Sequence, residues 1–560
     1  LNRRKQEEPD LKFSEKLNIF MAAHWRGFLT FITPIIFLPL VIPTDTCPKW
    51  KWVAFTLLVI IVFWVTECLP LAVTGFLPIV VFPLAEVTST ANVTKAYIND
   101  SVFMFLGSLM LAYSVEQSGY HRRLAYYCVR TIGFHSYFRL LLAICVVTTF
   151  VSLWITNTAA TSMMLPIAFA ILRVFEEGLL RVYDKNSDGT NVASDITTCY
   201  FCTITYSATN GGIGTLVGTG TNLVFKSLFT SNYPTSPEYL SFPLFSAFGV
   251  PFTILLEIST YFYMSIVYLG LFRKNSKVYE STKITDKGKK AVQATIEIES
   301  KKLGSLTFWE LMVLILFGTA IVGFFSRSPQ IFPGWADIIN DYFGSTDPRF
   351  IKDSALAMLV LFGMFLLPNS LKILDNFKAK YYEDLPKTTI GTVLLWKEMD
   401  ADMPYNFMFL LGGGIALSQA AKSSGLNDKL GEFLSVLAVL PNSLILLIVI
   451  LCVVFVTNLA SNIAVANVFC PIAMTLAEKI KVNPLWYILA SGFSASFCYM
   501  LPVGTPGNLI VKNVASVSTM KMMVAGIGST IACIVWGWLC LLFYAPLVWP
   551  DITTYPTWAS

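Results

Sequence analysis

The recurrence of long apolar segments is the feature that most constrains how this chain can fold. Between Phe28 and Leu547, segment after segment is long enough to cross the roughly 30 Å hydrocarbon core of a bilayer. Only 13% of the residues are charged, about half the share that is usual for soluble domains. The sequence therefore predicts an all-α polytopic membrane protein, and it excludes disordered chains, collagen and secreted disulfide scaffolds.

Eleven apolar segments are predicted to be transmembrane helices. They lie near residues 28–42, 52–68, 71–86, 101–117, 198–226, 243–271, 305–325, 354–368, 404–421, 484–512 and 522–547. Two further apolar regions, 137–175 and 439–478, differ because a polar tip interrupts each of them midway. Each of these two regions can form two full spans joined at the surface or a re-entrant hairpin.

Lysine and arginine counts predict the orientation, because short cytoplasmic loops are enriched in basic residues. Residues 1–27 carry six basic side chains and residues 273–302 carry nine, whereas residues 327–353 carry three basic side chains against four aspartates. We therefore expect the first two segments on the cytoplasmic side and the third outside. The sequons at Asn92 and Asn99 would then be extracellular, and Asn92 is the predicted glycosylation site.

This topology predicts five regions along the chain. They are a cytoplasmic N-terminal segment (1–27), a first half (28–271) with a hairpin at 137–175, a cytoplasmic linker (272–304), a second half (305–549) with a hairpin at 439–478, and an extracellular C-terminal tail (550–560).

The two interrupted regions belong to an internal repeat, in which Asn157 and Asn462 lie 305 residues apart. Each asparagine precedes a proline by nine residues, Pro166 in the first region and Pro471 in the second. Matching blocks flank them, namely Val217-Gly-Thr-Gly-Thr-Asn-Leu223 with Val503-Gly-Thr-Pro-Gly-Asn-Leu509, and Gly107-Ser-Leu with Gly413-Gly-Ile. Under the predicted topology the halves are inverted in the membrane. That arrangement is typical of secondary transporters, which bind substrate near the midplane between the repeats.

The blocks 217–223 and 503–509 share a Gly-Thr-X-X-Asn motif, which is predicted to break the helix inside an otherwise apolar span. The polar groups at the two tips and at these two breaks suit a carboxylate. Amides and hydroxyls donate hydrogen bonds, and a helix N-terminus adds free N–H groups with about half a positive charge. The oxygen atoms of the same groups are hard ligands for a small cation. The alternative is that Asn157 and Asn462 only cap helices while the glycines only permit close packing. Paired motifs in both halves favour a binding site.

These motifs resemble the divalent-anion/sodium symporter family, which includes carriers of citrate, dicarboxylates and sulfate. The resemblance covers nearly the whole chain and rests on Trp64-Val-Thr-Glu-Cys-Leu-Pro70, the two tips and the two breaks. Within the family, Ala23-His-Trp-Arg-Gly27 and Phe332-Pro-Gly-Trp-Ala-Asp337 are similar to the insect "I'm Not Dead Yet" carriers of Krebs-cycle acids. The resemblance to this family implies eleven spans, two re-entrant hairpins, a homodimer in the plasma membrane, and elevator-like movement of a transport domain against a scaffold.

The resemblance also implies site residues. One sodium site would use Ser152, Thr156, Asn157 and Gly218, and the other would use Thr457, Ala460, Asn462 and Gly504. Substrate carboxylates would meet Asn157, Thr158 and Thr219 from the first half, and Ser461, Asn462, Thr505 and Pro506 from the second. The chain departs from the family pattern at Ile463, where a threonine hydroxyl is expected. Some insect relatives are thought to work without sodium, so both sodium-coupled and cation-independent transport stay open.

We therefore expect a secondary active transporter of di- and tricarboxylates such as citrate and succinate, with no cofactor and with Na⁺ as the coupling ion if there is one. Sodium-coupled sulfate transport is the alternative. An enzyme would need a nucleophile, base or metal cluster, and the sequence, with three histidines, supplies none. The excess of basic over acidic residues is only five, which gives no support for a nucleic-acid partner.

Glu67, Glu116 and Glu257 fall in or near apolar segments, where an ionisable side chain is costly. Glu257 is the most internal of the three. A structural hydrogen-bonding role is favoured for it over proton coupling.

Overall fold

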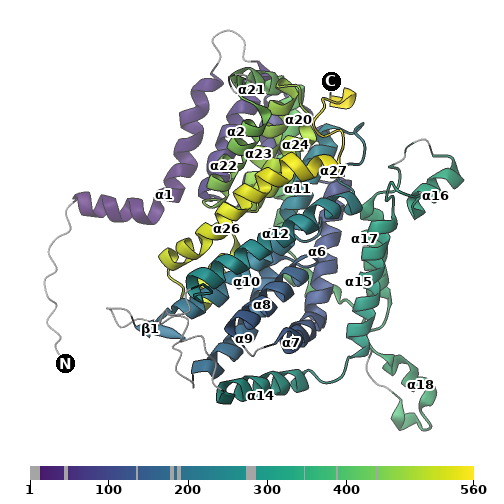
Figure 1. Ribbon diagram of the computed structural model, residues 1–560. Coiled ribbons are helices and arrows are strands. Elements are labelled where there is room, and N and C mark those ends of the chain that lie inside the picture. Colours follow the sequence, from purple (N-terminus) through teal and green to yellow (C-terminus); the bar gives the residue numbers. More distant parts are fainter. Residues whose placement is uncertain are drawn as a thin grey trace, which may run out of the picture.

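The computed structural model describes residues 13–42, 48–133, 136–176, 182–185, 191–272, 286–345, 347, 349–385, 389–434, 436 and 439–559. Most of these residues are helical, and Figure 1 shows the helices crossing one another around α10, α11 and α12.

The first half of the chain contains α1 (Phe13–Phe37), η1 (Leu38–Leu40), α2 (Lys49–Thr66), α3 (Leu71–Thr74), α4 (Leu77–Leu84), α5 (Thr90–Lys95), α6 (Asp100–Ser118), α7 (Tyr120–Ile132), α8 (Tyr137–Ser152), α9 (Asn157–Glu176), β1 (Tyr183–Lys185), β2 (Asn191–Ala193), α10 (Asp195–Ile213), α11 (Gly220–Asn232) and α12 (Phe242–Tyr268). The second half contains α14 (Asp286–Lys302), α15 (Phe308–Ser326), α16 (Trp335–Phe343), α17 (Asp353–Leu366), η2 (Leu371–Leu374), α18 (Asp375–Lys378), η3 (Tyr382–Asp384), α19 (Trp396–Asp402), α20 (Asn406–Ser423), α21 (Leu426–Leu434), α22 (Asn442–Thr457), α23 (Asn462–Lys479), α24 (Pro484–Ser494), α25 (Pro506–Ala515), α26 (Thr519–Leu539), η5 (Cys540–Tyr544), α27 (Ala545–Val548) and η6 (Thr557–Ala559).

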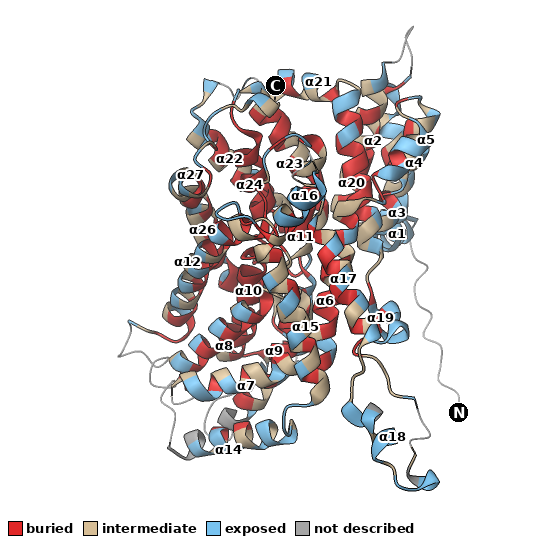
Figure 2. Ribbon diagram, turned by 90° about the vertical axis from the view of Figure 1, so that its right-hand side faces the viewer, coloured by how far each residue is buried: buried red, intermediate tan, exposed pale blue. Residues whose placement is uncertain are grey.

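The sequence repeat is also a repeat of helices. In chain order, α8 to α12 correspond to α22 to α26, and both hairpins contain a proline inside their second helix, Pro166 in α9 and Pro471 in α23. The halves interlock, because α9 packs against α25 of the other half and α23 packs against α11. Helix α10 lies in the centre of the bundle and is buried from Thr197 to Ile213 (Figure 2).

The two apolar segments in which a Gly-Thr-X-X-Asn break was predicted are broken helices. The segment 198–226 is divided into α10 and α11 by residues 214–219, and the segment 484–512 is divided into α24 and α25 by residues 495–505. The segment 71–86, which was expected to be a continuous span, is two short helices, α3 and α4. Glycine and proline explain the interruptions, because they favour chain reversal and helix starts over helix interiors.

Six helical segments among the described residues are long and apolar enough to cross a membrane. They are Phe13–Leu40, Lys49–Thr66, Thr90–Ser118, Phe242–Tyr268, Phe308–Ser326 and Thr519–Val548. Shorter apolar segments are Leu71–Leu84, which spans α3 and α4, and the single helices Tyr137–Ser152, Asp353–Leu366 and Asn442–Thr457. Helix α1 begins at Phe13, well before the expected start at residue 28. The count of eleven spans stays a prediction.

Segments that are distant in the sequence gather at two opposite ends of the molecule. Helices α7, α14 and α18 lie at one end, whereas α21 and the C-terminal residues lie at the other (Figure 1). At this second end Trp558 packs against the rings of Phe229, Tyr233 and Tyr239. The C-terminal tail is thus packed against the first half.

Two local features differ from the sequence-based expectations. Residues 286–302, expected as part of a solvated linker, form α14, which packs against α7 and α9 and buries Val292 and Ile296. The all-α expectation also misses the antiparallel hairpin of β1 and β2. Strands of three residues are too short for an alternating pattern to predict them.

Candidate functional site

Helices α8 and α9 form a hairpin whose tip carries the first half of the candidate site. Helix α8 ends at Ser152 and α9 begins at Asn157. Ser152 Oγ lies 3.0 Å from Asn157 Oδ1 and 2.6 Å from the carbonyl oxygen of Ala208 in α10. A hydroxyl, an amide oxygen and a backbone oxygen therefore converge at this tip.

The hairpin of α22 and α23 repeats this arrangement in the second half. Thr457 Oγ1 lies 2.9 Å from Asn462 Oδ1 and 2.5 Å from the carbonyl oxygen of Ala495, just after α24. Threonine thus takes the place of serine, and the two oxygen clusters are otherwise equivalent.

Each oxygen cluster holds three oxygen atoms but only one hydroxyl proton. Because a hydroxyl donates a single hydrogen bond, Ser152 and Thr457 cannot satisfy both neighbouring acceptors at once. A cation among the three oxygens would use the lone pairs that remain, and neutral oxygen ligands suit a small hard cation. Across the described ranges, no group of three or more His, Cys, Asp or Glu side chains could hold a metal ion.

Two asparagines close the breaks that face these tips. Asn222 Nδ2 donates to the carbonyl oxygens of Gly212 at 2.9 Å and Thr215 at 2.7 Å. In the second half, Asn508 Nδ2 donates to those of Cys498 at 3.2 Å and Leu501 at 3.0 Å. Buried carbonyl groups at a helix end need donors, because neither water nor lipid can supply them there. The asparagine in each Gly-Thr-X-X-Asn break therefore stabilises it.

Glycine allows each break to approach its tip. A Cβ atom at Gly218 would lie 2.9 Å from the carbonyl oxygen of Ser152, and one at Gly504 would lie 2.5 Å from that of Thr457. Both neighbours are backbone atoms, so a side chain at either position would have to displace the main chain.

The structure brings most of the predicted sodium-site residues together. Close contacts join Ser152, Asn157 and Gly218 in the first half, and Thr457, Asn462 and Gly504 in the second. The Thr156 hydroxyl instead accepts a hydrogen bond from the N–H of Ala159 at 3.3 Å. Ala460 is buried, and its N–H donates to the carbonyl oxygen of Val456.

The predicted substrate residues keep donors free. The Oδ1 atoms of Asn157 and Asn462 accept from Ser152 and Thr457, which leaves the two Nδ2 groups available. The side chains of Thr158, Thr219 and Ser461 are half-buried and form no hydrogen bond with any residue that the structure describes. Thr505 caps the N-terminus of α25, where its Oγ1 atom accepts from the N–H of Asn508, and Pro506 is exposed as the first helical residue.

The two half-sites meet where the halves interlock. A Cβ atom at Gly220, the first residue of α11, would lie 3.2 Å from Cδ1 of Ile463. Thr205 Oγ1 of α10 donates to Asn508 Oδ1 at 2.9 Å. The tip of the second hairpin therefore lies against the N-terminus of α11, beside Thr219.

Several residues of this arrangement were not predicted as site residues. Asn222 and Asn508 lie in the motifs that define the breaks, so their spacing was a usable signal. The carbonyl groups of Ala208 and Ala495 had no such signal, because every residue type carries a backbone oxygen.

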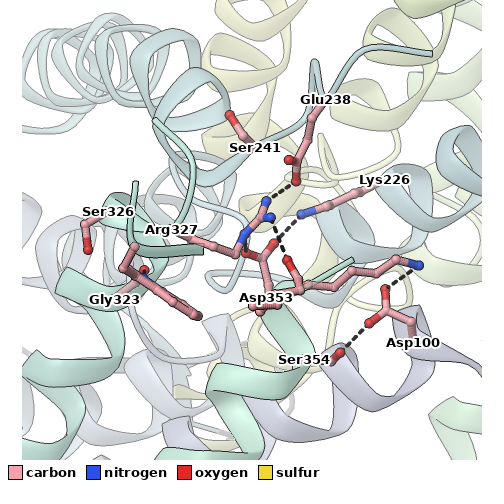
Figure 3. Close-up of polar contacts among 12 residues, drawn as sticks. Asp100, Lys226, Glu238, Ser241, Gly323, Ser326, Arg327, Asp353 and Ser354 are labelled. Carbon is pink, nitrogen blue, oxygen red and sulfur yellow. Dashed lines mark hydrogen bonds and ion pairs between the residues drawn. The ribbon is translucent and has the colours of Figure 1, made fainter. Parts of the chain in front are cut away.

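A second polar feature lies beside α11, where a cavity of about 430 Å³ borders α6, α11 and α17. Figure 3 shows the buried ion cluster next to it, formed by Lys226, Glu238, Arg327 and Asp353. The Asp353 carboxylate lies 2.9 Å from Lys226 Nζ and 2.5 Å from Arg327 Nε. Arg327 also pairs with Glu238, which precedes α12. Burial raises the pKa of Glu238 above its ordinary value, although Arg327 acts in the opposite direction.

Comparison with known proteins gives consistent matches over most of the chain. Residues 22–550 match the family described as "Sodium:sulfate symporter transmembrane region". The chain is 34% identical to "Protein I'm not dead yet" of Drosophila melanogaster, covering 99% of this chain and 94% of that protein. It is 31% identical to "Solute carrier family 13 member 2" of Homo sapiens over 90% of each chain, and 30% identical to "Na(+)/citrate cotransporter" of Mus musculus over 94% and 96%.

Among solved structures, the Alcanivorax borkumensis YdaH transporter is similar with a TM-score of 0.50 and 12% sequence identity. The match covers 82% of this chain and 87% of that chain. At this level of identity the likeness shows a shared fold.

Proposed function

The chain belongs to the sodium:sulfate symporter family, and from this premise we propose that it is a secondary active transporter of di- and tricarboxylates such as succinate and citrate. It is a mostly helical, multi-pass membrane transporter and not an enzyme. Two of its relatives are named as "Na(+)/citrate cotransporter" and "Na(+)/dicarboxylate cotransporter 3".

The observation that carries the proposal is the paired geometry of the two hairpin tips. Each tip presents an asparagine Nδ2 group and the N-terminus of a helix, α9 or α23. Free hydroxyls of Thr158, Thr219 and Ser461 lie beside them. Two sets of donors suit a substrate with two carboxylates, because each set can satisfy one carboxylate.

We propose that each of the two oxygen clusters binds a coupling cation, Na⁺. The donor set supports this assignment, because hydroxyl, amide and carbonyl oxygens are neutral hard ligands and one acceptor in each cluster lacks a proton donor. Asn157 and Asn462 would then contact both the cation and the anion, through Oδ1 and Nδ2 respectively. Binding of either would favour binding of the other.

We further propose a homodimer in the plasma membrane that works by elevator-like movement, with α8–α9 and α22–α23 as re-entrant hairpins. In this topology α7 and α14 face the cytoplasm, and α16 and the C-terminus face outward. The proposal is supported by the positions of α7 and α14 at one end of the molecule and of the C-terminal residues at the other (Figure 1).

Uptake of labelled succinate, citrate and sulfate into proteoliposomes, each with sodium and with choline, tests the function. We expect uptake of succinate and citrate to exceed that of sulfate. Uptake of sulfate alone would replace the proposal with the sulfate symporter that the family description names. Equal uptake in sodium and choline would remove the coupling cation and leave the anion site in place.

A further inference from the structure

Glu257 is a carboxyl group in the interior of the helix bundle. It lies in the middle of α12, one of the segments apolar enough to cross a membrane, and is 9% exposed. Ser207 Oγ of α10 donates to its Oε1 atom at 2.6 Å, and Asn210 Nδ2 donates to Oε2 at 2.8 Å. The side chains of Cys145 and Thr149 approach it from α8.

This carboxyl group has no basic partner in the part of the chain that the structure describes, because no Lys, Arg or His side chain there forms an ion pair with Glu257. The titratable groups near it are uncharged ones, the Cys145 thiol of α8 and the Tyr499 phenol, which in turn contacts Cys533 of α26. An isolated buried carboxylate is costly, and a group in this situation takes up a proton or holds another cation.

The surroundings of Glu257 accept both of its protonation states. A serine hydroxyl can donate to a carboxylate or accept from a carboxylic acid, so Ser207 fits either form. Asn210 donates to Oε2, which remains an acceptor in both forms when Oε1 carries the proton. Both neighbours can therefore stay beside the side chain when it gains or loses a proton, and only the Ser207 hydroxyl has to turn.

The close contacts favour a proton over a metal ion. The hydrogen bonds of 2.6 Å and 2.8 Å to Glu257 come from donor groups, Ser207 Oγ and Asn210 Nδ2, whereas a metal ion needs acceptor oxygen atoms around it. A proton on the carboxyl group needs no such set of ligands.

Glu257 is also linked to both candidate half-sites. Ser207 precedes Ala208, whose carbonyl oxygen belongs to the first oxygen cluster. Asn210 Oδ1 accepts from the Tyr499 hydroxyl at 2.8 Å, and Tyr499 follows Cys498, whose carbonyl oxygen accepts from Asn508 at the second break. The charge of Glu257 can thus act on both halves of the site.

We propose that Glu257 is a proton-binding site of the transporter, which loads one proton together with the anionic substrate and releases it on the other side. The proton comes from water on the loading side, converts the carboxylate to a carboxylic acid, and returns to water when the substrate leaves. The inference rests on the proposed function for its coupling to substrate, whereas proton binding itself does not depend on it. It assigns Glu257 a role beyond the structural hydrogen bonding that the sequence favoured.

Infrared difference spectroscopy of the purified protein in lipid, recorded over a range of pH, tests proton binding directly. We expect a carbonyl band of a protonated carboxylic acid that disappears at high pH and is missing in Glu257→Gln. Glu310→Gln is the matched control, because Glu310 is also buried but is ion-paired with Arg123 at 2.7 Å, and this variant should keep the band. If Glu257→Gln does not fold, Ser207→Ala should shift the band in frequency. A spectrum without such a band, or a band unchanged in Ser207→Ala and Glu257→Gln, overturns the proposal.

Transport in proteoliposomes tests the coupling. External pH is held constant, so that the ionic forms of external succinate do not change, and only the internal pH is raised. One pH unit should increase succinate accumulation by the wild type up to about tenfold, and should have no effect on Glu257→Gln. If succinate accumulation by the wild type does not change with internal pH, the coupling of proton binding to succinate transport is overturned, whereas the proposed transport function is not affected. If the wild type takes up no succinate, the proposed function fails, and the infrared result still decides proton binding.

Discussion

The side-chain amides of Asn157 and Asn462 are proposed to bind both ligands, the cation and the carboxylate substrate. Each Oδ1 atom belongs to an oxygen cluster, and each Nδ2 group is available to a carboxylate. We expect Asn157→Ala and Asn462→Ala each to remove most succinate uptake without loss of surface expression. Loss of a hydrogen bond to a charged group costs about 1.5–3 kcal/mol, roughly a ten- to hundred-fold effect on binding.

Asn442→Ala is the matched control, because it makes the same change at an exposed position at the opposite end of α22. Its uptake should equal that of the wild type. Near-normal uptake by Asn157→Ala or Asn462→Ala would contradict the two-tip site.

Ile463 offers a second test at the scale of one side chain. It lies against Gly220 at the start of α11, where the family pattern places a hydroxyl. Ile463→Thr would add one donor beside the carboxylate, worth up to about 1.5–3 kcal/mol before the cost of fitting the new side chain. The concentration dependence of succinate uptake should show a lower half-saturation value. An unchanged value in a variant with normal expression would mean that residue 463 does not face the substrate.

The two sequons are distinguished by their side-chain contacts. Asn92 is exposed, whereas Asn99 caps α6 by accepting from the N–H of Val102 at 3.1 Å and donates to Ala96 O at 2.8 Å. We therefore expect Asn92→Gln to abolish the glycosidase-sensitive shift in electrophoretic mobility, and Asn99→Gln to leave it in place. A shift that persists in Asn92→Gln would contradict the assignment, and a wild type without any shift would contradict the extracellular position.

At the scale of helices, sequence reasoning located the tips but not the ends of the helices around them. The prolines nine residues after Asn157 and Asn462 revealed the hairpins, because the same spacing recurs. The Gly-Thr-X-X-Asn motifs predicted a break inside 198–226 and inside 484–512, but not that residues 214–219 and 495–505 all leave the helix, because apolar side chains continue on both sides of each break. Hydropathy averages over a window and does not detect a few residues that leave the helix inside the protein.

The first break gives a prediction at this scale. Gly218→Ala would place Cβ 2.7 Å from Gly212 O and 2.9 Å from Ser152 O, so the break must move away from the tip. Such overpacking costs about 1–3 kcal/mol, and we expect uptake to be lost because the first oxygen cluster is distorted.

Gly318→Ala in α15 is the control, since a Cβ atom there would meet no atom within 4 Å. Alanine is the better helix former, by about 1 kcal/mol, so this variant should transport normally and have an unchanged or higher thermal midpoint. Equal uptake by both variants would show that the approach of Gly218 to Ser152 is not needed for transport.

At the scale of the whole molecule, the sequence predicted which segments share an end but not how the halves are held together. Basic residues predicted the linker on the cytoplasmic side and the C-terminal tail on the other side, and α14 of the linker and the C-terminal residues lie at opposite ends of the structure. The buried ion cluster joins residues more than a hundred positions apart, Lys226 and Asp353. Single charged residues near the ends of apolar segments do not reveal their partners, because such pairing depends on the packing of whole helices.

This ion cluster supplies the last prediction. Asp353 is the central carboxylate, because it pairs with Lys226 of α11 and with Arg327 at the end of α15, and it begins α17 (Figure 3). Asp353→Asn would leave two buried cations with one fewer counter-charge, and breaking a buried pair costs about 3–5 kcal/mol. We expect a clear fall in the thermal midpoint of the purified transporter. Lys429→Ala breaks an exposed pair with Glu432 instead, for at most about 1 kcal/mol, and should leave the midpoint nearly unchanged. Equal midpoints for the two variants would show that the cluster does not hold α11 against α15 and α17.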